Sequence, residues 1–262
     1  MKSVYTGSEK VAEFESYDEL RVGENKPAFI YEGNELVYPN PVKDGLVLWY
    51  DFSGRTNTDG QRGIAEDLSG NGNHGTLQNF NFTEESGYVE DGLKFDGVDD
   101  RVLMVSPGEE SKAFLSSEMT IVWSGVIRET QAKSGINQIL SAGYVNGWAL
   151  GYHGQVDRLM YTVRDSNAST GYYIRYIDRP PFGEFFTFAM TFKNGEVTAY
   201  LNGIEKNKAV DTGDIIYSTY PAVEITSSIH QTTESCKIYN RPLTPEEIAH
   251  NYAIEKERFG IE

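Results

Sequence analysis

The chain contains 262 residues, and its 39 acidic side chains outnumber its 23 lysines and arginines, which gives a formal net charge of −16 at pH 7. Nucleic acid and anionic membrane surfaces both require a basic face, so this charge argues against either partner. No apolar run is long enough to cross a membrane, and the N-terminal residues lack the apolar core of a secretion signal. We therefore expect no nucleic-acid partner, no membrane insertion, and synthesis in a cytoplasm without a signal peptide.

The composition is typical of a β protein. Glycine occurs 26 times, tyrosine 17 times and phenylalanine 13 times, which suits strands joined by many turns. A chain of this length can bury about 70–75% of its unfolded surface, so it needs no covalent staples. Its single cysteine, Cys236, excludes an intramolecular disulfide, and we expect this side chain to be buried.

Residues 1–44 form a lead-in that carries a short echo. Two copies of the pattern Y-x-G-x-E-x-V begin at Tyr5 and Tyr31, and each predicts a hairpin. A hairpin alone is marginal in water, so it must lie on the main domain, pair with another copy of itself, or attach to a partner. Pro39 and Pro41 mark the junction with the main domain. Chance similarity and a true repeat both stay open as explanations of the echo.

The rest of the chain is organised around Asp67–Leu77, which reads DLSGNGNHGTL. Its glycines and asparagines tolerate positive φ, so the stretch fixes one irregular path between two strands. The strand before it, Gly45–Phe52, is apolar on both faces and is therefore expected to be covered on both sides. The phrase Asp91–Met104 predicts a short strand, a turn and a second strand.

Further strands follow, mostly in pairs. Glu118–Arg128 predicts a strand whose core residues are Ile121, Trp123 and Val126. Later strands are expected at Gln138–Tyr144, Trp148–Tyr152, Arg158–Arg164, Tyr172–Ile177, Phe185–Phe192, Val197–Leu201, Val223–Ile229 and Ser235–Tyr239.

A helix is expected near the end of the chain. Thr244 is a natural N-cap, Glu247 completes a capping box three residues later, and Pro245 falls at the first helical position. Leu243 and Ile248 can form a hydrophobic staple across the cap. These residues together predict a helix that begins at position 245.

Four phrases, in this order, resemble one family. They are GLVLWYDFSG from Gly45, DLSGNGNHGTL from Asp67, GLKFDGVDDRV from Gly92 and KIYNRPLTPEEIAHNY from Lys237. Together they resemble the laminin G-like, concanavalin A-like jelly-roll modules of bacteriophage structural proteins and bacterial surface proteins. The resemblance implies an all-β, antiparallel jelly-roll β-sandwich with a small N-terminal β appendage and a short C-terminal helix.

The residues do not predict catalysis. Jelly-roll glucanases of this superfamily carry the motif E-x-D-x-x-E on one strand. The most similar sequence here, EFESYDE at Glu13–Glu19, has the wrong spacing and precedes the domain. His74 belongs to the family's phrase and is expected to be a structural hydrogen-bonder. No catalytic residue is assigned. The four histidines, which form no i, i+4 metal pair, are His74, His153, His230 and His250.

Calcium is the one cofactor that the loops leave open, since oxygen-rich irregular loops suit a hard cation. The alternative, which we prefer, is that Asp67 caps a turn while Asp99 and Asp100 close a hairpin. A sugar-binding calcium fits less well, because Glu234 and Ser235 stand where family members often carry aspartates. No metal ligand is therefore assigned. The candidate ligands are Asp67, Asn71, Asn73, Asp96, Asp99 and Asp100.

Glycan binding is the second open question. Aromatic rings over a concave sheet can stack on sugar rings, and five aromatic side chains lie on consecutive middle strands. The alternative is that they belong to the core. Strand alternation places Tyr172 and Tyr173 on opposite faces, so one of them is expected to face outward. The five residues are Trp148, Tyr152, Tyr161, Tyr172 and Tyr173.

These observations favour a non-enzymatic role. Our first interpretation is a structural or decorating protein of a phage virion, in which an attachment segment at 1–44 binds other virion proteins and a jelly-roll domain at 45–262 is exposed to host-surface or environmental glycans. A symmetric homo-oligomer on an extracellular particle is then expected. The second interpretation is a carbohydrate-binding or adhesion module of a bacterial surface protein, and the third is a glycoside-active enzyme.

Overall fold

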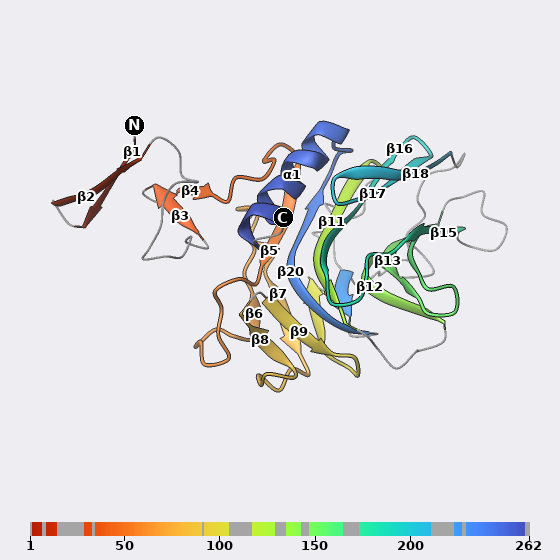
Figure 1. The fold of residues 1–262 in the computed structure, drawn as a ribbon, viewed down its shortest axis with the longest axis horizontal. Coiled ribbons are helices and arrows are strands. Elements are labelled where there is room, and N and C mark those ends of the chain that lie inside the picture. The colour runs from red at the N-terminus through yellow and green to blue at the C-terminus, as the bar shows by residue number, and fades with distance from the viewer. Residues whose placement is uncertain are drawn as a thin grey trace.

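The described residues form two large antiparallel sheets and one C-terminal helix (Figure 1). The computed structural model describes residues 2–6, 9–14, 29–32, 35–90, 92–104, 117–128, 135–142, 147–164, 173–210, 223–226 and 229–259. The sheets pack face to face over a shared apolar core, so the predicted β-sandwich is confirmed.

The first sheet, here called the β13 sheet, has the strand order β15-β14-β13-β12-β19-β10-β7-β6. Its members pair antiparallel throughout, as the alternation of apolar and polar residues predicts. The strands are β6 (Ile64–Ala65), β7 (Gly75–Gln78), β10 (Arg101–Met104), β12 (Ile136–Ala142), β13 (Trp148–His153), β14 (Arg158–Val163), β15 (Tyr173–Asp178) and β19 (Val223–Thr226).

The second sheet, here called the β11 sheet, has the order β18-β17-β16-β11-β20-β9-β8, with β5 paired to the far half of β20. The last strand is longer than expected, because it begins at His230 rather than Ser235. The strands are β5 (Leu46–Asp51), β8 (Gly87–Val89), β9 (Gly92–Asp96), β11 (Met119–Ile127), β16 (Phe185–Lys193), β17 (Glu196–Leu201), β18 (Ile204–Val210) and β20 (His230–Tyr239).

The prediction of one core residue, Val126, is wrong. Ile121 and Trp123 are fully buried, but Val126 lies on the other face and is only half-buried, whereas Ile127 enters the core. The alternation of β11 continues unbroken through Gly125, which takes the inward position. A Cβ atom at Gly125 would lie 2.2 Å from the Thr232 carbonyl oxygen and 2.7 Å from the Trp123 ring, so only glycine fits at this inward position.

The expected hairpin at Asp99 and Asp100 is also wrong. Strand β9 pairs with β8 and β20 in the β11 sheet, whereas β10 pairs with β7 and β19 in the β13 sheet. The turn between them therefore carries the chain from one sheet to the other, as jelly-roll connections do.

Helix α1 (Pro245–Arg258) covers the outer face of the β11 sheet, as Figure 1 shows in blue. The predicted capping box is present, since the Thr244 hydroxyl accepts a hydrogen bond from the Glu247 amide and the Glu247 carboxylate accepts one from the Thr244 amide. Leu243 and Ile248 are both buried in a second cluster that also contains Trp49. This cluster supplies the outer cover that the strand at Gly45–Phe52 was expected to need.

Replacing Thr244 with alanine is expected to lower the free energy of unfolding by about 1 kcal/mol, because the Glu247 amide loses its acceptor. Denaturant unfolding followed by circular dichroism measures the change. Replacing Thr244 with serine keeps the acceptor and should cost much less. An unchanged midpoint in the alanine variant would contradict the capping role.

Buried charged side chains form ion pairs between α1 and the sheet beneath it. The Lys237 ammonium of β20 pairs with the Glu255 carboxylate, which also accepts a hydrogen bond of 3.0 Å from the Ser235 hydroxyl. Arg258 pairs with Asp51 of β5 and lies 3.5 Å from Glu255. None of these four charged side chains is more than 4% exposed. Burial alone lowers the pKa of Arg258, but the charges of Asp51 and Glu255 outweigh this and raise it.

The described residues of the lead-in form two separate two-stranded sheets. Strands β1 (Lys2–Thr6) and β2 (Glu9–Phe14) pair antiparallel, and so do β3 (Ile30–Glu32) and β4 (Glu35–Tyr38). Both predicted hairpins are therefore present, with their turns outside the described residues. Figure 1 shows them at the left, and within the described residues their strands pair with neither large sheet.

The end of the lead-in contacts the domain. Tyr38 is only 4% exposed, the Val42 amide donates to the Asn251 side chain, and the Asn40 carbonyl lies 3.0 Å from the His250 ring nitrogen. Asn40 and Val42 thus contact α1, while the proposed boundary at residue 44 stays a prediction. Among the described residues, no helix is both long and apolar enough to cross a membrane.

Candidate functional site

Both oxygens of the Asp67 carboxylate accept hydrogen bonds from within the fold, mostly from backbone amides. Its two oxygens accept from the amides of Trp49, Ser69 and Asn73 and from the Ser69 hydroxyl, at 2.8 to 3.0 Å. Its own amide donates to the His74 ring, 3.0 Å away. Asp67 therefore fixes the start of the glycine-rich stretch onto β5, and His74 acts as the structural hydrogen-bonder that was expected.

The two asparagines of this stretch are engaged in the same way. The Asn73 side chain donates to the Val47 carbonyl at 2.7 Å, and the Asn71 side chain donates to the Leu46 carbonyl at 3.1 Å. Their orientation toward β5 carbonyls makes these side chains structural. Of the six candidate calcium ligands, three thus serve the fold.

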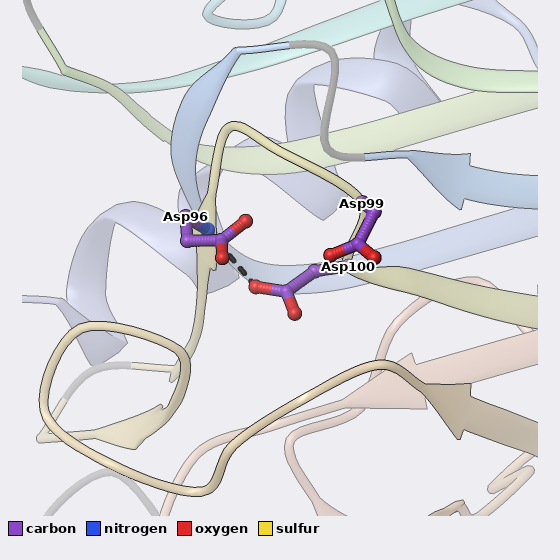
Figure 2. Close-up of side chains that lie close together, drawn as sticks. All are labelled: Asp96, Asp99 and Asp100. Carbon is purple, nitrogen blue, oxygen red and sulfur yellow. Dashed lines mark hydrogen bonds between the residues drawn. The ribbon is translucent and has the colours of Figure 1, made fainter.

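The other three gather at the turn between β9 and β10. The carboxylate oxygens of Asp96, Asp99 and Asp100 lie within 4.8 Å of one another, and Figure 2 shows them around one bend of the chain. Asp100 is 1% exposed; one oxygen accepts from the Ser86 hydroxyl at 2.9 Å and the other from the Asp96 amide at 2.9 Å. Asp96 in turn accepts from the Val98 amide. The cluster has the oxygen chemistry for a hard cation, and it also closes the turn by itself.

Burial dominates the electrostatics of this turn. It raises the pKa of Asp100 to about 6, against the opposing effect of hydrogen bonds from Asp96 and Ser86, and the neighbouring carboxylates of Asp96 and Asp99 raise it further. A carboxyl whose pKa is raised by folding favours the protonated form. Its contribution to stability is therefore greatest at low pH and is lost as the pH rises through about 6.

In chelator-containing buffer, the unfolding free energy of the wild type should rise relative to that of Asp100→Asn by about 1 kcal/mol between pH 7 and pH 5. The asparagine cannot ionise, so the difference between the two proteins isolates this carboxyl from all others. Urea unfolding at several pH values measures it. A wild type that loses stability relative to the variant over this range would contradict the raised pKa.

The aromatic side chains proposed for glycan stacking are mostly core residues. Trp148 and Tyr161 are fully buried and Tyr152 is 6% exposed, so these three rings cannot receive a sugar. Tyr172 lies outside the described residues. Tyr173 is 38% exposed and faces outward, with the Arg175 guanidinium 5.1 Å from its ring centre.

A cavity of about 480 Å³, here called the edge cavity, opens between the two sheets at one side of the sandwich. Strands β14 and β15 and the turn after them supply one wall, and strands β17 and β18 supply the other. Its volume is in the range of small-molecule sites. The polar and aromatic residues that line it are Arg158, Tyr176, Asp178, Arg179, Asn202 and Lys206.

Local backbone features place two of these side chains. Asn202 and Gly203 have φ values of 52° and 75° and form the tight turn between β17 and β18. A bulge then interrupts the pairing, because Ala199 opposes Asn207 while Tyr200 opposes Glu205, and Lys206 is the extra residue. Bulges commonly re-aim a side chain, and this one presents Lys206 to the edge cavity.

The opposite wall is held rigidly. Arg179 donates to both oxygens of Asp157 and to the Pro180 carbonyl, and its guanidinium lies 3.6 Å from the centre of the Phe182 ring. Asp157 also accepts a hydrogen bond from the Tyr152 hydroxyl at 2.8 Å. The Arg179 guanidinium is therefore held by contacts with Asp157, Pro180 and Phe182.

Several groups in the edge cavity keep hydrogen-bonding capacity. Neither the Tyr176 hydroxyl nor the Lys206 ammonium has a hydrogen-bond or ionic partner within the described part of the chain. The Tyr176 ring is oriented by an edge contact with His153, at 5.6 Å between ring centres. Sequence reasoning missed this site, because the residues that line it come from strands far apart in the sequence.

A second cavity of about 580 Å³ lies beside β8 and is lined by Arg55, Asn57, Glu84, Tyr88 and Glu90 among others. Its main polar groups serve the loop itself. The Asn57 side chain donates to the Tyr88 carbonyl and accepts from the Tyr88 amide, and Arg55 donates to the Gln61 carbonyl. The edge cavity is the better candidate for a ligand.

No protein-family model and no curated protein sequence matches the chain. Solved structures with the same fold include the botulinum neurotoxin serotype D binding domain, with 13% identity, a TM-score of 0.60, and coverage of 81% of this chain and 52% of that one. The binding domain of botulinum neurotoxin DC in complex with SialylT has 14% identity, a TM-score of 0.60, and coverage of 83% and 52%.

A third similar structure is a Trypanosoma rangeli sialidase in complex with 2,3-difluorosialic acid, with 16% identity, a TM-score of 0.60, and coverage of 83% and 34%. This chain therefore spans about half of each neurotoxin binding domain and a third of the sialidase. At such identities the likeness shows the β-sandwich fold. The narrower laminin G-like assignment stays a prediction.

Proposed function

We propose that this chain is a non-catalytic glycan-binding module and that the edge cavity receives the sugar. The observation that carries the proposal is the meeting of an oriented aromatic ring, Tyr176, with donors from both sheets. The Asn202 and Lys206 donors of one sheet are unengaged within the described residues, and the Arg158 guanidinium of the other is paired only with the exposed Asp178. A sugar presents an apolar ring face beside many hydroxyl oxygens, so it suits a site that combines one aromatic surface with several donors.

The fold comparison supports the same class of function by analogy. One neurotoxin binding domain with this fold was solved in complex with SialylT, and the sialidase was solved with a sialic acid derivative. Since this chain matches only part of each, the analogy does not say where those ligands would lie.

The lining of the edge cavity supports binding without catalysis. Glycoside hydrolysis generally uses two carboxyl groups on either side of the scissile bond. Asp178 is the one carboxylate that lines the edge cavity within the described ranges, and 87% of its side chain is exposed. The Asp96, Asp99 and Asp100 cluster lines neither of the two cavities.

A glycan-array screen of the whole chain tests the proposal. We expect binding that is equal in calcium and in chelator and that is reduced at least fivefold in Tyr176→Leu. Tyr173→Leu is the matched control, because this exposed tyrosine of the same strand lies outside the edge cavity. Absence of glycan binding in both conditions would overturn the proposal, and a requirement for calcium would move the site to the acidic turn.

For the setting of this module we propose a phage particle, with a bacterial surface protein as the alternative. Support comes from the lead-in, whose two hairpins pair with neither large sheet in the part of the chain that the structure describes. Deletion of residues 1–28 should leave folding intact and abolish assembly with virion partners. Deletion through residue 44 is a poorer test, because it also removes the contacts of Tyr38, Asn40 and Val42. A shortened chain that still assembles would contradict attachment through this segment.

A further inference from the structure

The edge cavity reverses the charge balance of the chain. The whole sequence has 39 acidic residues against 23 basic ones, whereas the edge cavity is lined by three cations, Arg158, Arg179 and Lys206, and by one carboxylate, Asp178. Screening reduces the long-range repulsion of the acidic surface beyond about 8 Å at physiological ionic strength. The charged groups in direct contact with a ligand therefore decide whether an anionic or a cationic ligand is favoured.

The three cations differ in how freely they can meet a ligand. Lys206 is exposed and has no carboxylate partner within the described ranges. Arg158 pairs with Asp178 at 3.1 Å, but these side chains are 51% and 87% exposed, so the pair is weak and can open. Arg179 uses three of its five N–H groups on Asp157 and Pro180, which leaves two.

Donors dominate the other polar groups as well. The Asn202 side-chain oxygen already accepts from the Thr187 amide, so its NH₂ group is the part left for a ligand. A ligand here meets N–H donors and cations from both walls, and a neutral sugar would leave much of this donor capacity unmatched.

We propose, resting on the proposed function, that the edge cavity binds an acidic sugar, with the sugar's carboxylate between Lys206 and Arg158 and its ring against Tyr176. Guanidinium and ammonium groups from two different sheets then converge on one anionic group. The bulge at Lys206 supplies the second cation, which regular pairing of β17 and β18 would not place.

The test compares 3′-sialyllactose with lactose, using isothermal titration calorimetry on the whole chain. We expect sialyllactose to bind at least tenfold more tightly than lactose, and Lys206→Ala to weaken sialyllactose about five- to tenfold with little change for lactose. Lys208→Ala is the matched control, since this lysine of the same strand pairs with Glu196 and does not line the edge cavity. Weaker sialyllactose binding at high salt is expected too.

The experiment distinguishes a failure of the acidic-sugar inference from a failure of the proposed glycan-binding function. Equal binding of the two sugars would overturn the acidic specificity and leave the glycan-binding function standing. Sialyllactose binding that Lys206→Ala and Lys208→Ala affect equally would overturn the location of the carboxylate. No binding of either sugar, together with a blank glycan array, would overturn the proposed function itself and this inference with it.

Discussion

Replacing Glu255 with leucine is expected to lower the unfolding free energy by about 3–5 kcal/mol, because it leaves a buried cation without its counterion. Lys237 is 1% exposed, and Glu255 is its carboxylate partner. Within the described residues the Lys237 ammonium has two hydrogen-bond partners, Glu255 and the Ser235 hydroxyl, and in the variant only the hydroxyl would remain, 3.1 Å away. Arg258 keeps Asp51 and is affected less. Urea unfolding measures the loss.

A second variant separates the cost of an unpaired charge from the cost of disturbed packing. In Lys237→Met with Glu255→Leu, both charges are gone and the volumes are similar, so most of the lost stability should return. Glu246→Ala is the control on the same helix, because this exposed glutamate should cost less than about 1 kcal/mol. A double variant as unstable as Glu255→Leu alone would show that side-chain shape, not charge, matters at this position.

The helix and most strands could be predicted because the sequence signals for them lie within a few neighbouring residues. Thr244, Pro245 and Glu247 suffice to place the start of α1, and alternation suffices for the paired middle strands. The phase error at Val126 arose because glycine contributes no apolar side chain to the pattern. At Gly125 the Thr232 carbonyl oxygen and the Trp123 ring occupy the space that a side chain would need, which alternation alone cannot show.

The sites that depend on tertiary contacts could not be predicted. Lys237 alternates with core residues along its strand, and nothing in that pattern shows that it is buried; it is buried because α1 packs over it and brings Glu255. Arg158 and Lys206 are 48 positions apart in sequence, and only the packing of the two sheets brings them to one cavity. The placement of Lys206 in this cavity depends on a β-bulge, and no local sequence pattern reveals where that bulge lies.

Replacing Asp67 with alanine is the second change with a large expected effect, a loss of about 4 kcal/mol in unfolding free energy. Its carboxylate accepts four hydrogen bonds, and the Trp49 amide among the donors is buried. Hydrogen bonds to a charged group contribute about 1.5–3 kcal/mol each, and some donors will regain water at this half-exposed stretch. Asp67→Asn keeps the shape but turns an NH₂ group toward donors, so it should lose about half as much.

Calcium distinguishes this structural role from a ligand role. If Asp67 fixes the stretch through hydrogen bonds alone, the loss in Asp67→Ala is the same in calcium and in chelator. Asp99→Ala, at the exposed position of the acidic turn, should then cost less than about 0.5 kcal/mol in chelator. A loss in Asp67→Ala that appears only when calcium is present would make Asp67 a cation ligand. The glycine-rich stretch would then be a metal loop rather than a clasp on β5, and the carboxylate that organises the fold would be the same one that binds the ion.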